Sequence, residues 1–206
     1  GPSGVDFSVE RIWTIRQDAK GAPQLISQRP FVPFDLATRI DPLDVPAALA
    51  AVRRADNEVV RDWLRHGGDP NAFAPDGFNL FLAAAASGNT EVLRMLLLEG
   101  VGTVQADPGL PLRDPKRLGY DTGILAPHLS AQKGDANATI LLLCRSPLQL
   151  FARIEVNAHT PFLQAAFYGH VDLAKRIVDA LPKILTDGVD IGAATARLFA
   201  QTSLRG

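Results

Sequence analysis

The chain has 206 residues, of which 47% are hydrophobic and 21% are charged, a composition typical of a folded globular protein. Its 21 Lys and Arg against 22 Asp and Glu leave a net charge of −1, which argues against a dedicated nucleic-acid-binding protein because such proteins carry a basic excess. The single cysteine excludes a disulfide framework and a cysteine-based zinc site, and no apolar run reaches the roughly 20 residues of a membrane span. These features predict a soluble, cytoplasmic protein without a nucleic-acid or membrane partner.

The first 44 residues lack the pattern of the rest of the chain. Residues 1–4 look like the remnant of a protease cleavage site with a short linker. Alternating side chains and a central turn cluster across residues 7–28 predict a β-hairpin. We expect residues 5–44 to form this hairpin and an extended, proline-punctuated lead-in, with Trp13 and Phe31 covering the first of the units that follow.

From residue 45 onward the sequence contains an internal repeat, with steps of 33, 46 and 35 residues between the equivalent positions Ala55, Gly88, Gly134 and Gly169. Glu58–Gly67 aligns with Glu91–Gly100, and Ala55 stands where Gly88 stands 33 residues later. Two further copies follow, in which the corresponding glycines are Gly134 and Gly169. We place the four copies at about residues 45–72, 73–101, 121–154 and 157–181.

Each copy has the composition of two short antiparallel helices. The first helix is rich in alanine, so neighbouring backbones can approach closely, and it ends at Gly or Ala. A polar residue then opens a second helix with an apolar stripe, and these N-cap candidates are Asp56, Asn89, Asp135 and, more weakly, His170. A single unit cannot bury its stripe, so we expect the copies to stack into an all-α solenoid.

The fourth copy carries the closest match to a known motif. Thr160–His170 is similar to the T-P-L-H-x-A-A-x-x-G-H motif of ankyrin repeats, in which Thr is the N-cap and Pro occupies the first helical position. Gly67–Ala72 resembles the linker of the same family, and the following residues match its finger, the turn between repeats. Pro46–Leu49 and Asn79–Leu82 depart from T-P-L-H, and the third copy keeps only the histidine. The chain thus resembles an ankyrin-repeat protein over residues 45–181.

Two segments lie outside the repeats. Residues 101–123 form an insertion with three prolines and three basic residues, which we expect to be a long loop on the finger side that contributes little to stacking. Residues 182–206 include an amphipathic pattern at Asp190–Gln201, which predicts a C-terminal capping helix.

No catalytic or metal-binding motif stands out, so we expect no enzymatic activity, no metal and no cofactor. The ankyrin resemblance implies that His128 and His170 are structural and hydrogen-bond neighbouring backbone. We interpret His66 and His159 as solvated linker residues and Cys144 as a buried, inert thiol.

The resemblance also implies a binding surface. In ankyrin repeats the finger tips and the ends of the first helices face one concave side. The positions it assigns here to partner binding are Phe73, Asp76, Phe78, Arg53, Arg54, Gln132, Lys133, Phe167 and Tyr168. Their aromatic and arginine content is typical of protein interfaces. Three alternatives stay open: the insertion covers the two finger phenylalanines, Phe167 and Tyr168 pack on the short finger at 157–160, and the two arginines form a plain solvated face.

The function we expect is protein–protein recognition through that concave surface, with no small-molecule ligand. An Ala- and Arg-rich composition is typical of high-GC bacteria, where such a protein would be an effector secreted into a host or neighbouring cell, or an immunity protein that inhibits a toxin. Two alternatives remain. One is an enzyme or enzyme fragment with a site built by the hairpin and residues 101–123, and the other is a domain that tethers a larger protein.

Overall fold

The computed structural model describes residues 11–17, 23–30, 40–114, 119–120, 122–155, 157–185 and 189–200. The chain divides into two units, Gly1–Thr38 and Arg39–Gly206. In the first unit, strands β1 (Arg11–Gln17) and β2 (Pro23–Pro30) pair antiparallel with an irregular register between Thr14 and Ile15. The expected remnant at 1–4, the turn between the strands, and the covering role of Trp13 and Phe31 lie outside the described side chains.

The second unit is helical in the part of it that the structure describes. Its helices are α1 (Val45–Arg54), α2 (Asn57–Arg65), α3 (Leu80–Ser87), α4 (Thr90–Arg94) with the π-helical turn η2 (Met95–Glu99), α5 (Ala126–Lys133), α6 (Ala136–Arg145), the 3₁₀ turn η4 (Pro147–Phe151), α7 (Pro161–Phe167), α8 (Val171–Asp179), α9 (Leu181–Ile184) and α10 (Ile191–Ala200). Among the described residues, none of these helices has the length and apolar character needed to cross a membrane.

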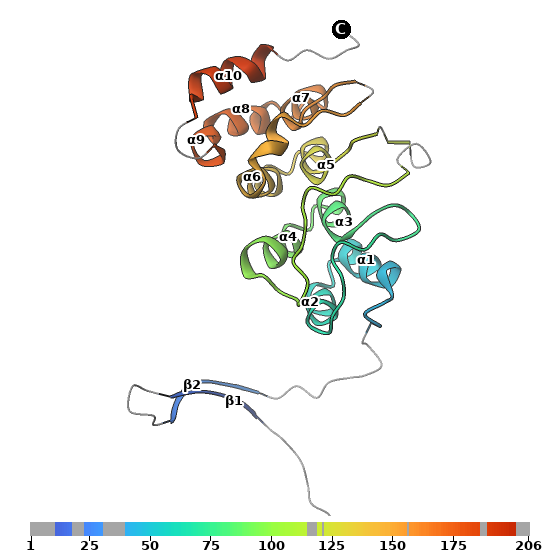
Figure 1. The fold of residues 1–206 in the computed structure, drawn as a ribbon, viewed down its shortest axis with the longest axis vertical. Helices are drawn as coiled ribbons and strands as arrows, with labels where there is room; N and C mark the ends of the chain where they lie inside the picture. The colour runs from blue at the N-terminus through green and yellow to red at the C-terminus, as the bar shows by residue number, and fades with distance from the viewer. Residues whose placement is uncertain are drawn as a thin grey trace, which may run out of the picture. The chain divides into compact units, whose positions relative to one another are not determined.

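The helices of the second unit lie in two rows (Figure 1). One row contains α1, α3, α5 and α7, in which each helix packs against the next. The other contains α2, α4, α6 and α8, which contact one another in the same order. Each helix of the first row also packs against the helix that follows it in the chain, so the copies found in the sequence correspond to helix pairs stacked side by side.

Polar caps begin several of these helices as expected. The Thr160 hydroxyl accepts a hydrogen bond from the Leu163 N–H at the start of α7, and Asn89 and Asp135 cap α4 and α6 in the same way. The expected side-chain cap at Asp56 is wrong, because its carboxylate accepts a hydrogen bond from Arg54 Nε at 2.9 Å instead.

Left-handed residues end the first helices. Gly88 and Gly134 have φ angles of +76° and +80° where α3 and α5 end. At the corresponding place after α1 stands Ala55, whose φ of +60° is a conformation that a side chain disfavours. This turn reverses the chain within two or three residues, which is why the second helix can lie antiparallel to the first.

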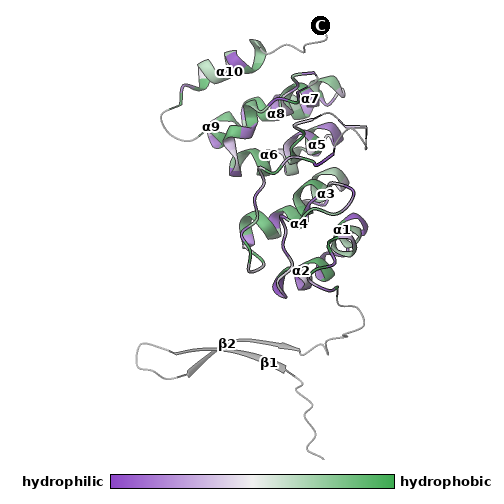
Figure 2. Cartoon of the chain, turned by 45° about the vertical axis from the view of Figure 1, so that its right-hand side comes forward, coloured by the Kyte–Doolittle hydropathy of each residue, from purple (hydrophilic) through white to green (hydrophobic). Residues whose placement is uncertain are grey.

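The core runs between the two rows. Helix α3 is buried on all sides over Leu80–Ala85, as its uniformly apolar sequence requires, whereas α2 and α8 bury only one stripe. Hydrophilic and hydrophobic residues accordingly alternate around most helices of this unit (Figure 2). Trp63 is the largest fully buried side chain among the described residues, and its indole Nε1 donates a hydrogen bond to the Asp41 carbonyl at 3.1 Å.

The insertion packs against the repeats more closely than expected. Leu112 is 3% exposed, and its N–H donates a hydrogen bond to the Ile124 carbonyl at 2.9 Å. Asn71 holds the insertion from the finger side: its Nδ2 donates to the Gln105 carbonyl and its Oδ1 accepts from the Asp107 N–H. The expectation that this segment contributes little to stacking is therefore wrong, because it supplies a core side chain and satisfies the side-chain amide of Asn71 in the first copy.

The far end of the second unit is covered by α10. Leu198 and Ala194 are buried, and the Phe199 ring meets the Phe162 ring edge-on at a centroid distance of 5.5 Å. The Arg197 guanidinium lies over the Phe151 ring, 4.1 Å from its centroid. Helix α10 therefore shields the apolar face that the last pair would otherwise expose.

Candidate functional site

The positions assigned to partner binding lie where the first-row helices end. Arg53 and Arg54 close α1, Gln132 and Lys133 close α5, and Phe167 closes α7. Because these helices pack in series, their last residues follow one another along one edge of the stack. We call this row the helix-end surface. It consists of the exposed Arg53, Arg54, Lys133, Phe167 and Tyr168, the half-buried Gln132 and the half-buried finger residue Asp76.

One end of the helix-end surface is held by an ion pair. Arg53 Nη2 lies 2.6 Å from Asp76 Oδ2, which joins the end of α1 to the finger, and its guanidinium also lies over the Phe78 ring. Both charged side chains remain partly exposed, so the pair contributes more to the position of the finger than to stability. Arg54 is similarly engaged with Asp56.

The structure contradicts the assignment of Phe73 and Phe78 to an open surface. Phe78 is 8% exposed and packs edge-on against Tyr120 of the insertion, with ring centroids 6.1 Å apart. Phe73 is half-buried beneath the Arg113 guanidinium, which lies 3.9 Å from its ring centroid. The insertion covers both rings, so they stabilise the fold and are not available to a partner.

The centre of the helix-end surface is polar. Lys133 Nζ donates a hydrogen bond to the Ser87 carbonyl at 2.7 Å and thereby ties the end of α5 to the end of α3. Gln132 Nε2 donates to the Tyr168 hydroxyl at 3.1 Å, which connects α5 to α7. These bonds orient the side chains and leave Lys133 exposed.

The other end of the helix-end surface is aromatic and exposed. Phe167 and Tyr168 have 70% and 46% of their surface accessible, and their rings meet edge-on at 5.3 Å. The Phe167 ring also lies 5.0 Å from the His159 ring, so one side of it rests on the short finger. Two adjacent, ordered and largely exposed aromatic rings are the feature of this row that a folded core does not require.

Two of the histidines, His128 and His170, make the hydrogen bonds that were expected of them. His128 is buried and hydrogen-bonded on both ring nitrogens: the Leu125 N–H donates to Nδ1, and Nε2 lies 3.1 Å from the Ala152 carbonyl. His170 Nε2 lies 2.9 Å from the Gln132 carbonyl, so both structural assignments agree with the contacts. His66 is exposed at the end of α2.

The interpretation of His159 as a solvated residue is wrong. The ring is buried, and its Nδ1 lies 3.0 Å from Gln164 Oε1 of α7. Its neighbour along the chain is the N-cap Thr160, so the turn that starts α7 draws the ring inward. Polar residue type alone did not indicate this, because the partner comes from the following helix.

Burial shifts the pKa of two titratable groups in the part of the chain that the structure describes, His128 and Cys144. Burial lowers the pKa of His128 to about 4, and burial raises the pKa of the half-buried Cys144 thiol, which disfavours the reactive thiolate. Within the same residues, no three His, Cys, Asp or Glu side chains gather closely enough to hold a metal ion.

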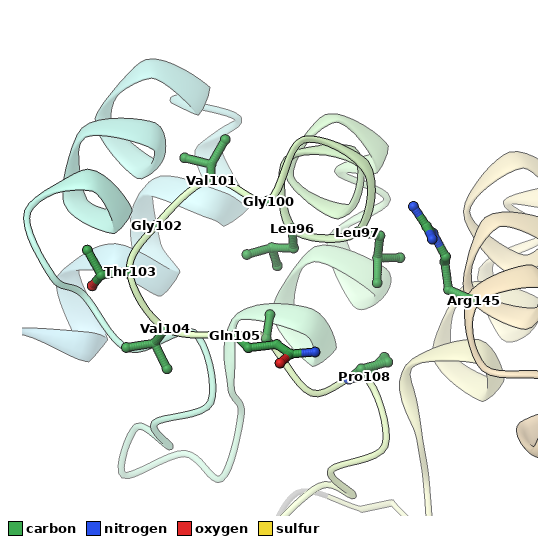
Figure 3. Close-up of a pocket in the computed structure, with 11 residues that line it drawn as sticks. Leu96, Leu97, Gly100, Val101, Gly102, Thr103, Val104, Gln105, Pro108 and Arg145 are labelled. Carbon is green, nitrogen blue, oxygen red and sulfur yellow. The ribbon is translucent and has the colours of Figure 1, made fainter.

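Sequence reasoning missed a cavity on the insertion side of the molecule. It has a volume of about 440 Å³ and lies between the end of η2, the start of the insertion and the end of α6 (Figure 3). Its apolar walls include Leu96, Leu97 and Val101, and Arg145 stands at its rim. The only local signal was the proline- and glycine-rich composition of the insertion, which indicates a loop without indicating what that loop encloses.

In a comparison with known families, no family model matches the chain. The resemblance to ankyrin repeats therefore rests on the sequence motifs, and it forms part of the proposal below.

Proposed function

We propose that this chain is an ankyrin-repeat protein that binds a partner protein through the helix-end surface, with Phe167 and Tyr168 as its main anchors. The observation that carries the proposal is the pair of exposed aromatic rings beside Gln132 and Lys133. Aromatic residues are enriched among the few interface residues that supply most of the binding energy.

Contacts between neighbouring helix pairs support the repeat assignment. Asn89 Nδ2, at the start of α4, donates a hydrogen bond to the Val52 carbonyl of the preceding pair at 3.0 Å. His170, at the start of α8, makes the corresponding contact with the Gln132 carbonyl of its preceding pair. In the second and fourth copies, the residue that precedes the second helix thus bonds the last turn of the preceding copy's first helix, as expected of a repeat whose units are built to stack.

The fixed positions of the Phe167 and Tyr168 rings support a binding role. Exposed side chains usually sample several rotamers, and their immobilisation lowers the affinity of an interface. Here the Tyr168 hydroxyl accepts a hydrogen bond from Gln132, and Phe167 is flanked by the rings of Tyr168 and His159. Both rings are therefore held in place before a partner arrives, which reduces the entropy that binding costs.

The size of the surface also fits the proposal. Four helix pairs at an interaxial spacing of about 9 Å span roughly 35 Å, and a standard interface buries about 800 Å² on each partner. The row from Arg53 at one end to Phe167 at the other can supply that area without a contribution from the covered finger.

Affinity capture with matched variants tests the proposal. The whole chain would be immobilised as the wild type, as the double variant Phe167→Ala/Tyr168→Ala, and as Leu148→Ala. Leu148 is 92% exposed on η4 and does not belong to the helix-end surface, so it controls for the loss of any exposed apolar side chain. We expect at least one protein from a native lysate to bind the wild type and Leu148→Ala but not the double variant.

The captured protein would then be purified and titrated. A single substitution, Tyr168→Ala, is expected to weaken its binding about 30-fold, which corresponds to about 2 kcal/mol. Equal binding by the wild type and the double variant, with both folded by circular dichroism, would exclude the helix-end surface as the site.

The identity of the captured protein would test two more specific roles. Capture of a toxin would favour an immunity protein, and capture of a host protein would favour a secreted effector. A second domain on longer homologous chains would instead favour a tether. The enzyme alternative, with a site built by the hairpin and residues 101–123, would be supported instead by turnover that depends on both segments.

A further inference from the structure

The cavity at the start of the insertion shares no residue with the helix-end surface. It is bounded by the end of η2, by residues 100–108 and by Arg145 at the end of α6. Figure 3 shows the insertion curving around one side while the Arg145 side chain extends from α6 toward Leu97. A volume of about 440 Å³ places it at the small end of ligand pockets, where one or two amino-acid residues fit and a helix does not.

Contacts outside the cavity hold its walls in place. Asn71 bonds both the Gln105 carbonyl and the Asp107 N–H, at 2.9 and 2.7 Å. Gln149 is buried, and its Nε2 donates to the Pro108 carbonyl at 3.0 Å, so this wall is tied to η4 as well. The Val101 N–H donates to the Met95 carbonyl across the π-helical turn. The cavity is therefore formed before any ligand enters.

The π-helical turn shapes the apolar wall. In η2 the helix that began as α4 widens over Met95–Glu99, where Leu96 remains buried and Leu97 is half-buried beside the cavity. Such turns are rare and occur frequently at functional sites, because a wider turn costs stability that folding alone does not repay. Together with Val101 and Pro108, these leucines form an apolar wall for an aliphatic side chain.

The cavity offers several hydrogen-bond donors that have no partner in the described part of the chain. In the described part of the chain, the backbone N–H groups of Gly102 through Ala106 donate no hydrogen bond, and these residues line the cavity. Arg145 is exposed and, within the same residues, has no ion pair, hydrogen bond or ring partner. No acidic side chain belongs to the lining. The cavity thus combines an apolar wall with a cation and a run of free amides.

We propose that this cavity binds the C-terminal residue of a partner polypeptide, with an aliphatic last side chain against Leu97 and Val101 and the terminal carboxylate paired with Arg145. Guanidinium groups and consecutive backbone amides are the donors that carboxylates prefer. A chain terminus places its carboxylate next to its own side chain, so one ligand residue can meet both the apolar wall and Arg145, which line the same cavity. The site is a second recognition point, separate from the helix-end surface.

Peptide titration followed by amide NMR tests the proposal on the whole chain. The first probe is an N-acetylated pentapeptide that ends in Ala-Leu-Leu with a free carboxylate. The second is the same peptide as its C-terminal amide. The third is the amide with an aspartate placed before the two leucines, so that the carboxylate is internal. We expect saturable shifts at the amides of Gly102–Ala106 with the first probe and binding at least about 10-fold weaker with the other two.

Variants distinguish binding in the cavity from a general effect of the protein's charge. Arg145→Gln should weaken binding of the first probe about 10-fold. Val104→Asp places a negative charge, like that of the peptide carboxylate, at an exposed wall position and should weaken binding by a similar factor. Arg94→Gln is the matched control, because Arg94 is exposed at the end of α4 and does not line the cavity. That variant should bind like the wild type.

Three results would overturn the proposal. One is the absence of saturable shifts with the free-acid peptide up to millimolar concentration. Another is equal binding of the amidated peptide with the internal aspartate, which would assign the cavity to an internal acidic segment. The third is unchanged affinity in Arg145→Gln. Loss of the helix-end partner in the capture experiment would not change any of these outcomes, so the two proposals fail separately.

Discussion

The N–H of Arg113 donates a hydrogen bond to the Gly77 carbonyl at 3.1 Å and joins the insertion to the tip of the finger. The approach is so close that a Cβ atom on Gly77 would lie 2.0 Å from the Arg113 carbonyl oxygen. Gly77 also has a φ of +79°, which residues with a side chain disfavour. This contact places the insertion over Phe73 and Phe78 and so decides which aromatic residues remain exposed.

Gly77→Ala is therefore expected to destabilise the protein more than a glycine substitution at the same backbone angle elsewhere. Gly169 is the matched control, since its φ is +80° and nothing lies within 4 Å of an added Cβ. Gly169→Ala should cost about 1 kcal/mol from backbone strain alone, and Gly77→Ala should cost about 1–3 kcal/mol more. Urea denaturation measures both, and equal losses would mean that the insertion is not held against the finger.

Phe78 and Phe167 should respond in opposite ways to truncation. Phe78→Ala removes a buried ring that packs on Tyr120 and lies beneath Arg53, so the free energy of unfolding should fall by about 3 kcal/mol or more. Phe167→Ala removes a ring that is 70% exposed, so the free energy of unfolding should change by no more than about 0.5 kcal/mol. Thermal melts of the two variants check this difference, and a stable Phe78→Ala would contradict the covered finger.

Ala55 offers a stabilising substitution. Its φ of +60° costs about 1–2 kcal/mol for a residue with a side chain, and it is exposed, so Ala55→Gly removes strain without creating a cavity. We expect a gain of up to about 1 kcal/mol, reduced by the greater entropy of glycine in the unfolded chain. Ala50→Gly in the interior of α1 should instead cost about 1 kcal/mol. If chemical denaturation showed a lower free energy of unfolding for both variants, Ala55 would not be strained.

His128 should make stability depend on pH. Burial lowers its pKa in the folded protein to about 4, whereas an unfolded histidine has a pKa near the ordinary 6.5. The unfolded chain therefore binds the proton first, so the free energy of unfolding should decrease as pH falls from about 6.5 to 4, by up to about 1.4 kcal/mol per pH unit. Below pH 4 both states are protonated, and this contribution no longer changes.

His128→Gln is expected to reduce that slope. The glutamine does not titrate, so urea denaturation between pH 4 and 6.5 should show a smaller decrease than in the wild type, whatever the absolute stability of the variant. Above pH 7 the two proteins should have parallel dependences. Identical slopes in the acidic range would contradict the assignment of the effect to His128.

Local patterns predicted the elements whose causes are local. The internal repeat, the alanine-rich first helices and the cap at Thr160 follow from side chains that act within one or two turns of the backbone. The pairing of helices and the order of the first-row helices follow in turn, because each apolar stripe needs a neighbour to bury it. For the same reason the exposed end of the helix-end surface, Phe167 and Tyr168, was predictable once the register of the fourth copy was known.

Contacts between distant segments decided the rest. Phe78 and Phe167 are the same residue type at positions that both resemble a binding surface, yet only the insertion, through Tyr120 and Arg113, covers one of them. The cavity likewise depends on Arg145 standing beside Leu97, which lies in the preceding copy of the repeat. A repeat in the sequence predicts which residues occupy equivalent positions in successive helix pairs. An insertion breaks that equivalence, because the surface that it covers depends on its path across the repeats.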